Sequence, residues 1–143
     1  MSNPSEQDWR SEPWDLDVPY AYEHFNGKSL DEAEALFAEN AMLYQEDLMF
    51  MPEKCFAYYV HAYINYLMSS NSKGDSDGAS CFFSLYSVRK KEFASGGREL
   101  IARTIELMEE MKGKQQWYDA DLGIYGSFEE KADVIKHELK ALE

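Results

Sequence analysis

The chain has 143 residues, 45% of them apolar, and its 27 acidic and 14 basic side chains give a net charge of −13. A chain of this length fits one domain that needs neither a metal nor a disulfide to fold. Its charge repels phosphate backbones and anionic lipids, so we expect neither nucleic-acid nor membrane binding. The same charge attracts basic proteins, although it is also explained by solubility alone.

The N-terminus lacks the features of a secretion signal. Residues 1–8 contain neither a basic start nor an apolar core. No apolar run approaches the roughly 20 residues that a membrane-spanning helix needs. Cys55 and Cys81 each stand beside a phenylalanine in a predicted helix, which is typical of reduced core cysteines. We therefore expect a cytoplasmic protein.

Residues 1–18 differ in composition from the rest of the chain. They hold five acidic side chains against the single basic Arg10, contain two prolines and show no helical periodicity. We predict an irregular acidic arm over residues 1–18 and one helical domain over residues 19–143. Trp9 and Trp14 are the arm's only aromatic groups. One of them is expected to pin the arm to the domain; alternatively, a free arm uses them to grip a partner.

Three helical segments are predicted before residue 52. Pro19 precedes a short helix over residues 20–26, which Gly27 ends in the left-handed conformation. Ser29 and Glu32 form a capping box for a helix that ends near Asn40. Residues 41–51 predict a short helix or turn with Glu46 and Asp47 facing solvent.

The strongest helical pattern runs from Pro52 to about Ser69. Its apolar side chains follow two faces, formed by Phe56, Tyr59, Val60, Tyr63 and Leu67 and by Tyr58, Ala62 and Tyr66. A helix that is apolar nearly all round is a buried helix. We therefore predict an all-α fold of six or seven helices packed around a central helix, residues 52–69.

The remaining half of the chain predicts three more helices. One begins at Asp75 or Asp77 and ends before Gly96, and an amphipathic helix covers residues 97–112. Residues 113–126 predict an ordered loop held by aromatic side chains, with a short strand pair as the alternative. Ser127, followed by Glu130, predicts a second capping box and the last helix.

No motif in the sequence predicts a metal, a cofactor or a catalytic residue. None of His24, His61 and His137 has a glutamate three residues before it or a histidine four residues away. The calcium-loop pattern fails because Lys73 and Ser84 occupy its first and twelfth positions. Gly96-Gly97-Arg98 lacks the full phosphate-loop pattern.

Two sets of residues are candidate sites. The excess of aromatic and acidic residues outside the core stripes predicts a surface for a basic protein partner, at Tyr44, Glu46, Asp47, Trp117, Tyr118, Asp119 and Asp121. The first alternative is an enzyme or small-ligand binder with a pocket formed by Tyr59, His61 and Tyr63. The second is a homodimeric scaffold that buries its extra aromatic side chains against a second copy.

Part of the chain resembles a known class of protein. Residues 27–89 are similar to small acidic helical bacterial proteins, some of them regarded as immunity-type, especially at residues 46–52, 58–63 and 74–77. The resemblance transfers no site residue. It implies an antitoxin or immunity role, in which this chain masks a basic toxin.

Overall fold

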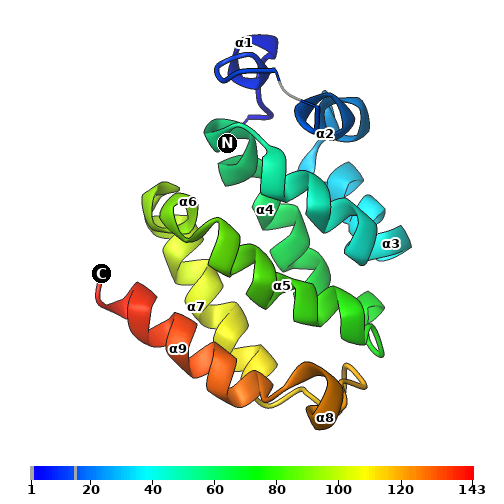
Figure 1. Ribbon diagram of the computed structural model, residues 1–143, viewed down its shortest axis with the longest axis vertical. Coiled ribbons are helices and arrows are strands. Elements are labelled where there is room, and N and C mark those ends of the chain that lie inside the picture. Colours follow the sequence, from blue (N-terminus) through cyan, green and yellow to red (C-terminus); the bar gives the residue numbers. More distant parts are fainter. Residues whose placement is uncertain (1, 15) are drawn as a thin grey trace.

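The computed structural model describes residues 2–14 and 16–143 of the protein. Within these residues the fold is all-α, with nine α-helices, one short 3-10 helix and no strand (Figure 1). The all-α prediction is confirmed. The structure has more helices than predicted because three of them, α1 (Glu6–Trp9), α6 (Lys90–Ser95) and α8 (Leu122–Tyr125), are too short to show a periodic apolar pattern.

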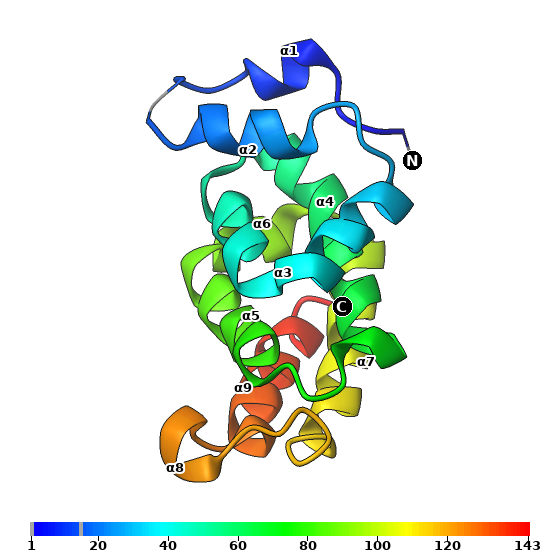
Figure 2. The ribbon, with the colours of Figure 1, turned by 90° about the vertical axis from the view of Figure 1, so that its right-hand side faces the viewer.

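The five longest helices form a closed ring of neighbours. They are α3 (Leu30–Phe50), α4 (Glu53–Met68), α5 (Ser76–Val88), α7 (Arg98–Lys112) and α9 (Phe128–Lys140). α4 packs on α3 and α7, α9 packs on α7 and α5, and α5 packs on α3. α1 packs on α4, and α2 (Val18–Phe25) packs on α3, so both lie at one end of the molecule, opposite α8 (Figure 2).

The predicted central helix is confirmed as α4, which Pro52 precedes. Most of its side chains are buried, and the hydroxyls of three of its buried tyrosines donate hydrogen bonds. Tyr59 donates to the carbonyl oxygens of Phe25 and Lys28, at 2.7 and 2.8 Å. Tyr63 donates to the carbonyl of Gly78, and Tyr66 donates to the Asp75 carboxylate. These hydrogen bonds let phenols occupy a core without leaving polar groups unpaired.

The N-terminal arm is more ordered than predicted. Ser5 and Asp8 form a capping box that starts α1, and Trp9 is fully buried. The prediction of an irregular arm is therefore wrong for residues 5–9, because one capped turn gives no periodic signal. Burial also removes Trp9 as a gripping residue. Trp14 stays partly exposed, with the Arg10 guanidinium 4.0 Å from its ring.

The two segments predicted on either side of Asn40 are one helix with a kink. Asn40 has non-helical backbone angles (φ −162°, ψ 84°) inside α3. Its side-chain oxygen accepts the Leu43 N–H at 3.1 Å and so caps the second segment. The predicted capping box of Ser29 and Glu32 is present, and Gly27 has the predicted positive φ.

Arg89 interrupts the helix predicted to run from Asp75 to Gly96. Its guanidinium Nη1 donates to the carbonyl oxygens of Leu48, Met49 and Met51, and its Nε donates to Glu92 at 2.8 Å. These contacts satisfy carbonyl groups at the end of α3, which lack partners within that helix. Arg89 therefore separates α5 from α6 and joins both to α3.

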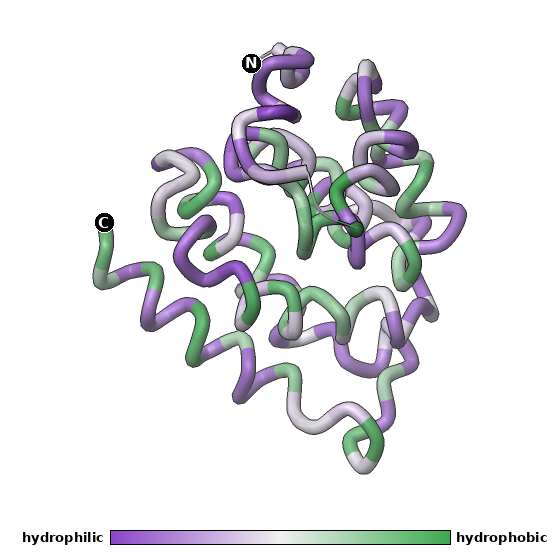
Figure 3. Tube along the Cα trace, turned by 45° about the horizontal axis from the view of Figure 1, so that its top comes forward, coloured by the Kyte–Doolittle hydropathy of each residue, from purple (hydrophilic) through white to green (hydrophobic). Residues whose placement is uncertain are grey.

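Residues 113–126 are ordered, as predicted, but they contain the short helix α8 as well as a loop, and the alternative of a strand pair is wrong. The Tyr118 hydroxyl donates to the Leu67 carbonyl at 2.7 Å, and Gly74 N–H donates to the Trp117 carbonyl. Apolar and polar residues alternate along α9, whereas α8 carries an apolar tip (Figure 3). Among the described residues, none of the helices is both long and apolar enough to cross a bilayer.

Candidate interaction surface

The residues predicted to form one acidic, aromatic patch lie at two ends of the molecule. The ring of Tyr44 lies 5.3 Å from that of His24 in α2, and Asp47 contacts the same histidine. The segment that holds Trp117, Tyr118, Asp119 and Asp121 precedes α8, at the opposite end of the fold (Figures 1 and 2). Tyr118 is moreover fully buried. The structure therefore brings together only the first part of the predicted patch.

Asp47 does not face solvent as predicted. It is 8% exposed, and its Oδ2 lies 2.7 Å from Nδ1 of His24. Burial raises the pKa of Asp47, and the hydrogen bond and charge of His24 oppose that rise. The sequence gives no sign of this pair, because its two members are 23 residues apart and lie on different helices.

The pair resembles the carboxylate–imidazole arrangement that orients a general base. In the part of the chain that the structure describes, however, no serine, threonine or cysteine is hydrogen-bonded to His24. The pair thus lacks the nucleophile contact that a hydrolytic site needs. Its evident effect is to join α2 to the second segment of α3.

A continuous exposed stripe runs along α3 beside this pair. We call it the α3 face; it consists of Glu39, Met42, Leu43, Glu46 and Phe50. Residues 42, 43, 46 and 50 repeat at helical spacing and point the same way. Met42 is 50% exposed, Leu43 47% and Phe50 44%, so three large apolar side chains meet solvent side by side on one helix.

The two carboxylates of the α3 face are free of ion pairs. Among the described residues, neither Glu39 nor Glu46 has a basic partner within salt-bridge distance. Glu39 and Met42 line one shallow depression together with Asp77 and Lys73, and Lys73 is the only basic residue among the described residues that line it. Unpaired carboxylates beside exposed apolar groups are available to cationic groups of another molecule.

The negative charge of the protein is concentrated in the part of the chain that builds this surface. Residues 1–88 hold 15 acidic and 4 basic side chains, a net charge of −11. Residues 89–143 hold 12 acidic and 10 basic side chains, a net charge of −2. The α3 face, with α2 and α5 on either side of it, therefore lies in the acidic half of the molecule.

The predicted pocket at His61 is only partly present. Tyr59 and Tyr63 point into the core, where their hydroxyls bond to backbone carbonyls and Tyr63 stacks on Phe37. His61 alone of the three lines a cavity, with Tyr58 beside it. The reason is the helical period: residues two apart on α4 point in very different directions.

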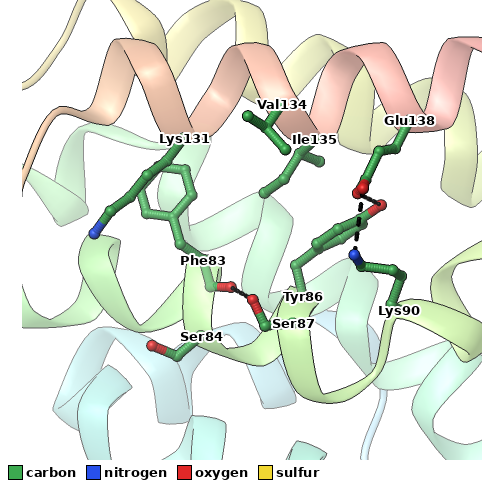
Figure 4. Close-up of a pocket in the computed structure, with 9 residues that line it drawn as sticks. All are labelled: Phe83, Ser84, Tyr86, Ser87, Lys90, Lys131, Val134, Ile135 and Glu138. Atoms are coloured by element: carbon green, nitrogen blue, oxygen red, sulfur yellow. Dashed lines mark hydrogen bonds and ion pairs between the residues drawn. The ribbon is translucent and has the colours of Figure 1, made fainter.

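A second groove lies between α5 and α9 and has a volume of about 300 Å³ (Figure 4). Phe83, Tyr86 and Ile135 form its apolar side. Its charged groups already have partners: Glu138 accepts hydrogen bonds from Tyr86 at 3.0 Å and from Lys90 at 3.3 Å, and Lys131 donates to the Tyr125 carbonyl. Because these charged groups already have partners within the protein, the groove is a weaker candidate binding site than the α3 face.

The cysteines and acidic groups give no support for thiol or metal chemistry. Cys55 is fully buried, and burial raises the pKa of its thiol to about 12, so it stays protonated at neutral pH. Burial also raises the pKa of Cys81. Across residues 2–14 and 16–143, no cluster of three or more histidine, cysteine, aspartate or glutamate side chains has the arrangement of a metal site.

Sequence reasoning missed Met42, Leu43 and Phe50. The signal was present, because these residues and Glu46 share one side of a helix that starts after Asn40. An apolar stripe is normally assigned to the core, and only the packing of α2 and α5 against the other sides of α3 shows that this one is exposed.

Comparison with known proteins adds no relative. No family model matches the chain, and neither a curated protein nor a solved structure matches it.

Proposed function

We propose that this protein is a binding protein whose α3 face holds a basic protein partner. The observation that carries the proposal is the juxtaposition of three exposed apolar side chains with two unpaired carboxylates on one helix. The partner would present apolar side chains flanked by lysine or arginine. Masking of a basic toxin, as in an immunity protein, is the most concrete form of this function.

The apolar and acidic groups have separate roles in this proposal. Burial of Met42, Leu43 and Phe50 would supply affinity, at roughly 25 cal/mol per Å² of apolar surface removed from water. Glu39 and Glu46, in a half of the molecule with a net charge of −11, would raise the association rate and select a basic partner. We therefore expect affinity to fall with added salt but not to vanish.

A second copy of this chain fits the α3 face less well than a basic protein does. A two-fold dimer buries the same patch on both subunits. Such pairing would bring the unpaired carboxylates of Glu39 and Glu46 close to those of the other copy. Like charges in an interface are unfavourable, so charge complementarity favours a different, basic chain.

The test is co-purification from the native host with paired charge-reversal variants. The test variant is Glu39→Lys with Glu46→Lys. The matched control is Glu106→Lys with Glu143→Lys, because both of these glutamates are exposed, lie outside the α3 face and give the same change in net charge. Circular dichroism and the melting temperature would verify that both variants fold.

We expect a basic protein to co-purify with the wild type and with the control variant, and to be lost from the test variant. Equal loss from both variants would show that only overall charge matters, which contradicts a localised site. Retention of the same partner by the test variant would place the interface elsewhere.

A further inference from the structure

A cavity of about 490 Å³ lies between the N-terminal segment, α4 and the turn that leads into α7. Its polar and charged lining side chains are Ser2, Asp8, Lys54, Tyr58, His61 and Glu99, and Ala57, Pro4 and Gly96 complete it. This cavity plays no part in the α3 face. Its defining feature is His61, whose side chain is buried in α4 although the residue is polar.

The hydrogen bonding of His61 fixes which ring nitrogen carries the proton. Nη1 of Arg103 lies 2.8 Å from Nδ1 of His61. A guanidinium has only donors, so Nδ1 accepts and, in the neutral ring, the proton is on Nε2. Burial and the charge of Arg103 lower the pKa of His61, which keeps the ring neutral near pH 7.

The Nε2–H group of His61 has no protein acceptor among the described residues. His61 is only 3% exposed. Two side-chain atoms of the described residues are both sealed from solvent and unpaired, and Nε2 of His61 is not one of them. Since the ring lines the cavity, Nε2–H reaches solvent there. The cavity therefore contains a fixed, oriented hydrogen-bond donor that no residue among 2–14 and 16–143 uses.

Two further features attract an anionic group to the same cavity. Lys54, which is 78% exposed at its side chain, lines the cavity, and its Nζ lies 3.8 Å from Asp8. α7 begins at the cavity's edge, after Gly96 and Gly97, and no side chain of the described residues caps its first N–H groups. Uncapped N–H groups at the positive end of a helix favour a carboxylate or another anion.

The cavity also contains two carboxylates, and these decide the class of ligand. Asp8 is held ionised, because hydrogen bonds from Ser5 lower its pKa. Glu99 lies in the first turn of α7 and has no ion-pair partner within residues 2–14 and 16–143. A phosphate, with its greater charge, would be repelled by both groups, and a simple cation would leave the His61 donor unpaired.

We propose that this cavity binds a small zwitterion of the amino-acid class. Its carboxylate accepts from Nε2–H of His61 and from the start of α7, with Lys54 nearby. Its ammonium group lies against Glu99 and Asp8. The side chain of the ligand contacts Tyr58 and Ala57. This proposal is independent of the α3 face, so either can fail without the other.

The test is titration of the full chain with each of the standard amino acids, followed by ¹H–¹⁵N NMR. At about 5 mM ligand the method detects dissociation constants in the millimolar range. We expect at least one amino acid to shift the amide signals of Ala57, Tyr58, Gly96, Gly97 and Glu99. We also expect the His61 ring to show the Nε2–H tautomer and its signal to move with the ligand.

Three further ligands test whether the cavity requires both charged groups of the zwitterion. They are the amine that lacks the carboxylate, the acid that lacks the amine, and inorganic phosphate. Each should bind about tenfold more weakly than the amino acid, because it leaves one half of the site unpaired. No shift with any amino acid would overturn the proposal, as would equal binding of the amine alone or of phosphate.

Exposed lining residues allow variants that keep the fold intact. Glu99→Gln and Lys54→Met should each weaken the amino acid about fivefold to tenfold. Their matched controls are Glu106→Gln on the same helix and Lys91→Met on α6, which are exposed and do not line the cavity. Unchanged affinity in both Glu99→Gln and Lys54→Met would also overturn the proposal.

Discussion

Nη1 of Arg103 lies 2.8 Å from Nδ1 of His61, and the same guanidinium donates to Asn65 through Nη2. The contact holds a permanently charged group against a buried imidazole. Protonation of that imidazole would remove its acceptor lone pair and place two positive charges together. His61 is therefore a buried base that the fold keeps neutral.

This relationship predicts a loss of stability in mild acid. The pKa of His61 is lowered in the folded protein, so the unfolded chain takes up a proton first as the pH falls below about 6.5. The stabilisation is fully present above that pH and is lost as the pH falls toward the lowered folded pKa. Urea unfolding of wild type and His61→Gln between about pH 8 and pH 5 checks this. The wild type should lose stability more steeply, and parallel curves would contradict the account.

Arg89 should be among the residues most important for stability. It is buried and donates to three backbone carbonyls at the end of α3, as well as to Glu92. Arg89→Met leaves these buried acceptors unpaired and should lower the free energy of unfolding by about 3 kcal/mol. Urea denaturation measures this. Arg98→Met is the control, since Arg98 is exposed, and should change stability by at most about 0.5 kcal/mol.

Two substitutions of Trp9 should distinguish the stability that its packing contributes from the stability that its unpaired N–H group costs. It is fully buried against Tyr22 and Tyr59, and its indole N–H has no acceptor among the described residues. Trp9→Ala should cost about 3–5 kcal/mol. Trp9→Phe loses some packing but removes the unpaired donor, so it should stay within about 1 kcal/mol of wild type.

Thermal and urea unfolding of both Trp9 variants provide the measurement. Hydrogen exchange of the amides around α1 adds a local readout, because loss of the indole should free the N-terminal segment first. A Trp9→Phe variant as unstable as Trp9→Ala would mean that the indole N–H has a partner in solution.

The parts of the fold that sequence predicts well are those with a strong local cause. The apolar periodicity of residues 52–69 identifies α4, the pairing of Ser29 with Glu32 identifies the start of α3, and Gly27 adopts its expected positive φ. Each depends on residues within one or two turns of one another. The short helix α1 escapes this reasoning because a single turn has no period to detect.

The candidate site was only half predictable, because burial depends on contacts between distant segments. Glu46 is exposed as expected, whereas Tyr44 is partly buried against His24 and Phe25. Asp47, one residue after Glu46, turns inward because His24 of another helix meets it there. Tyr118 was assigned to the surface by its loop context, yet its hydroxyl reaches the Leu67 carbonyl, 51 residues away. No local pattern encodes either contact.

Site-specific photo-crosslinking is the most direct test of the proposed interaction surface. A photoreactive amino acid replaces Leu43 on the α3 face or, as the matched control, Ile124 on α8, which is more exposed and lies outside the α3 face. The crosslinked species formed in the native host are identified by mass spectrometry. The account predicts a single basic protein crosslinked at Leu43, absent at Ile124, and lost when Glu39→Lys and Glu46→Lys are added. The same proteins crosslinked at both positions, or an acidic partner at Leu43, would contradict it.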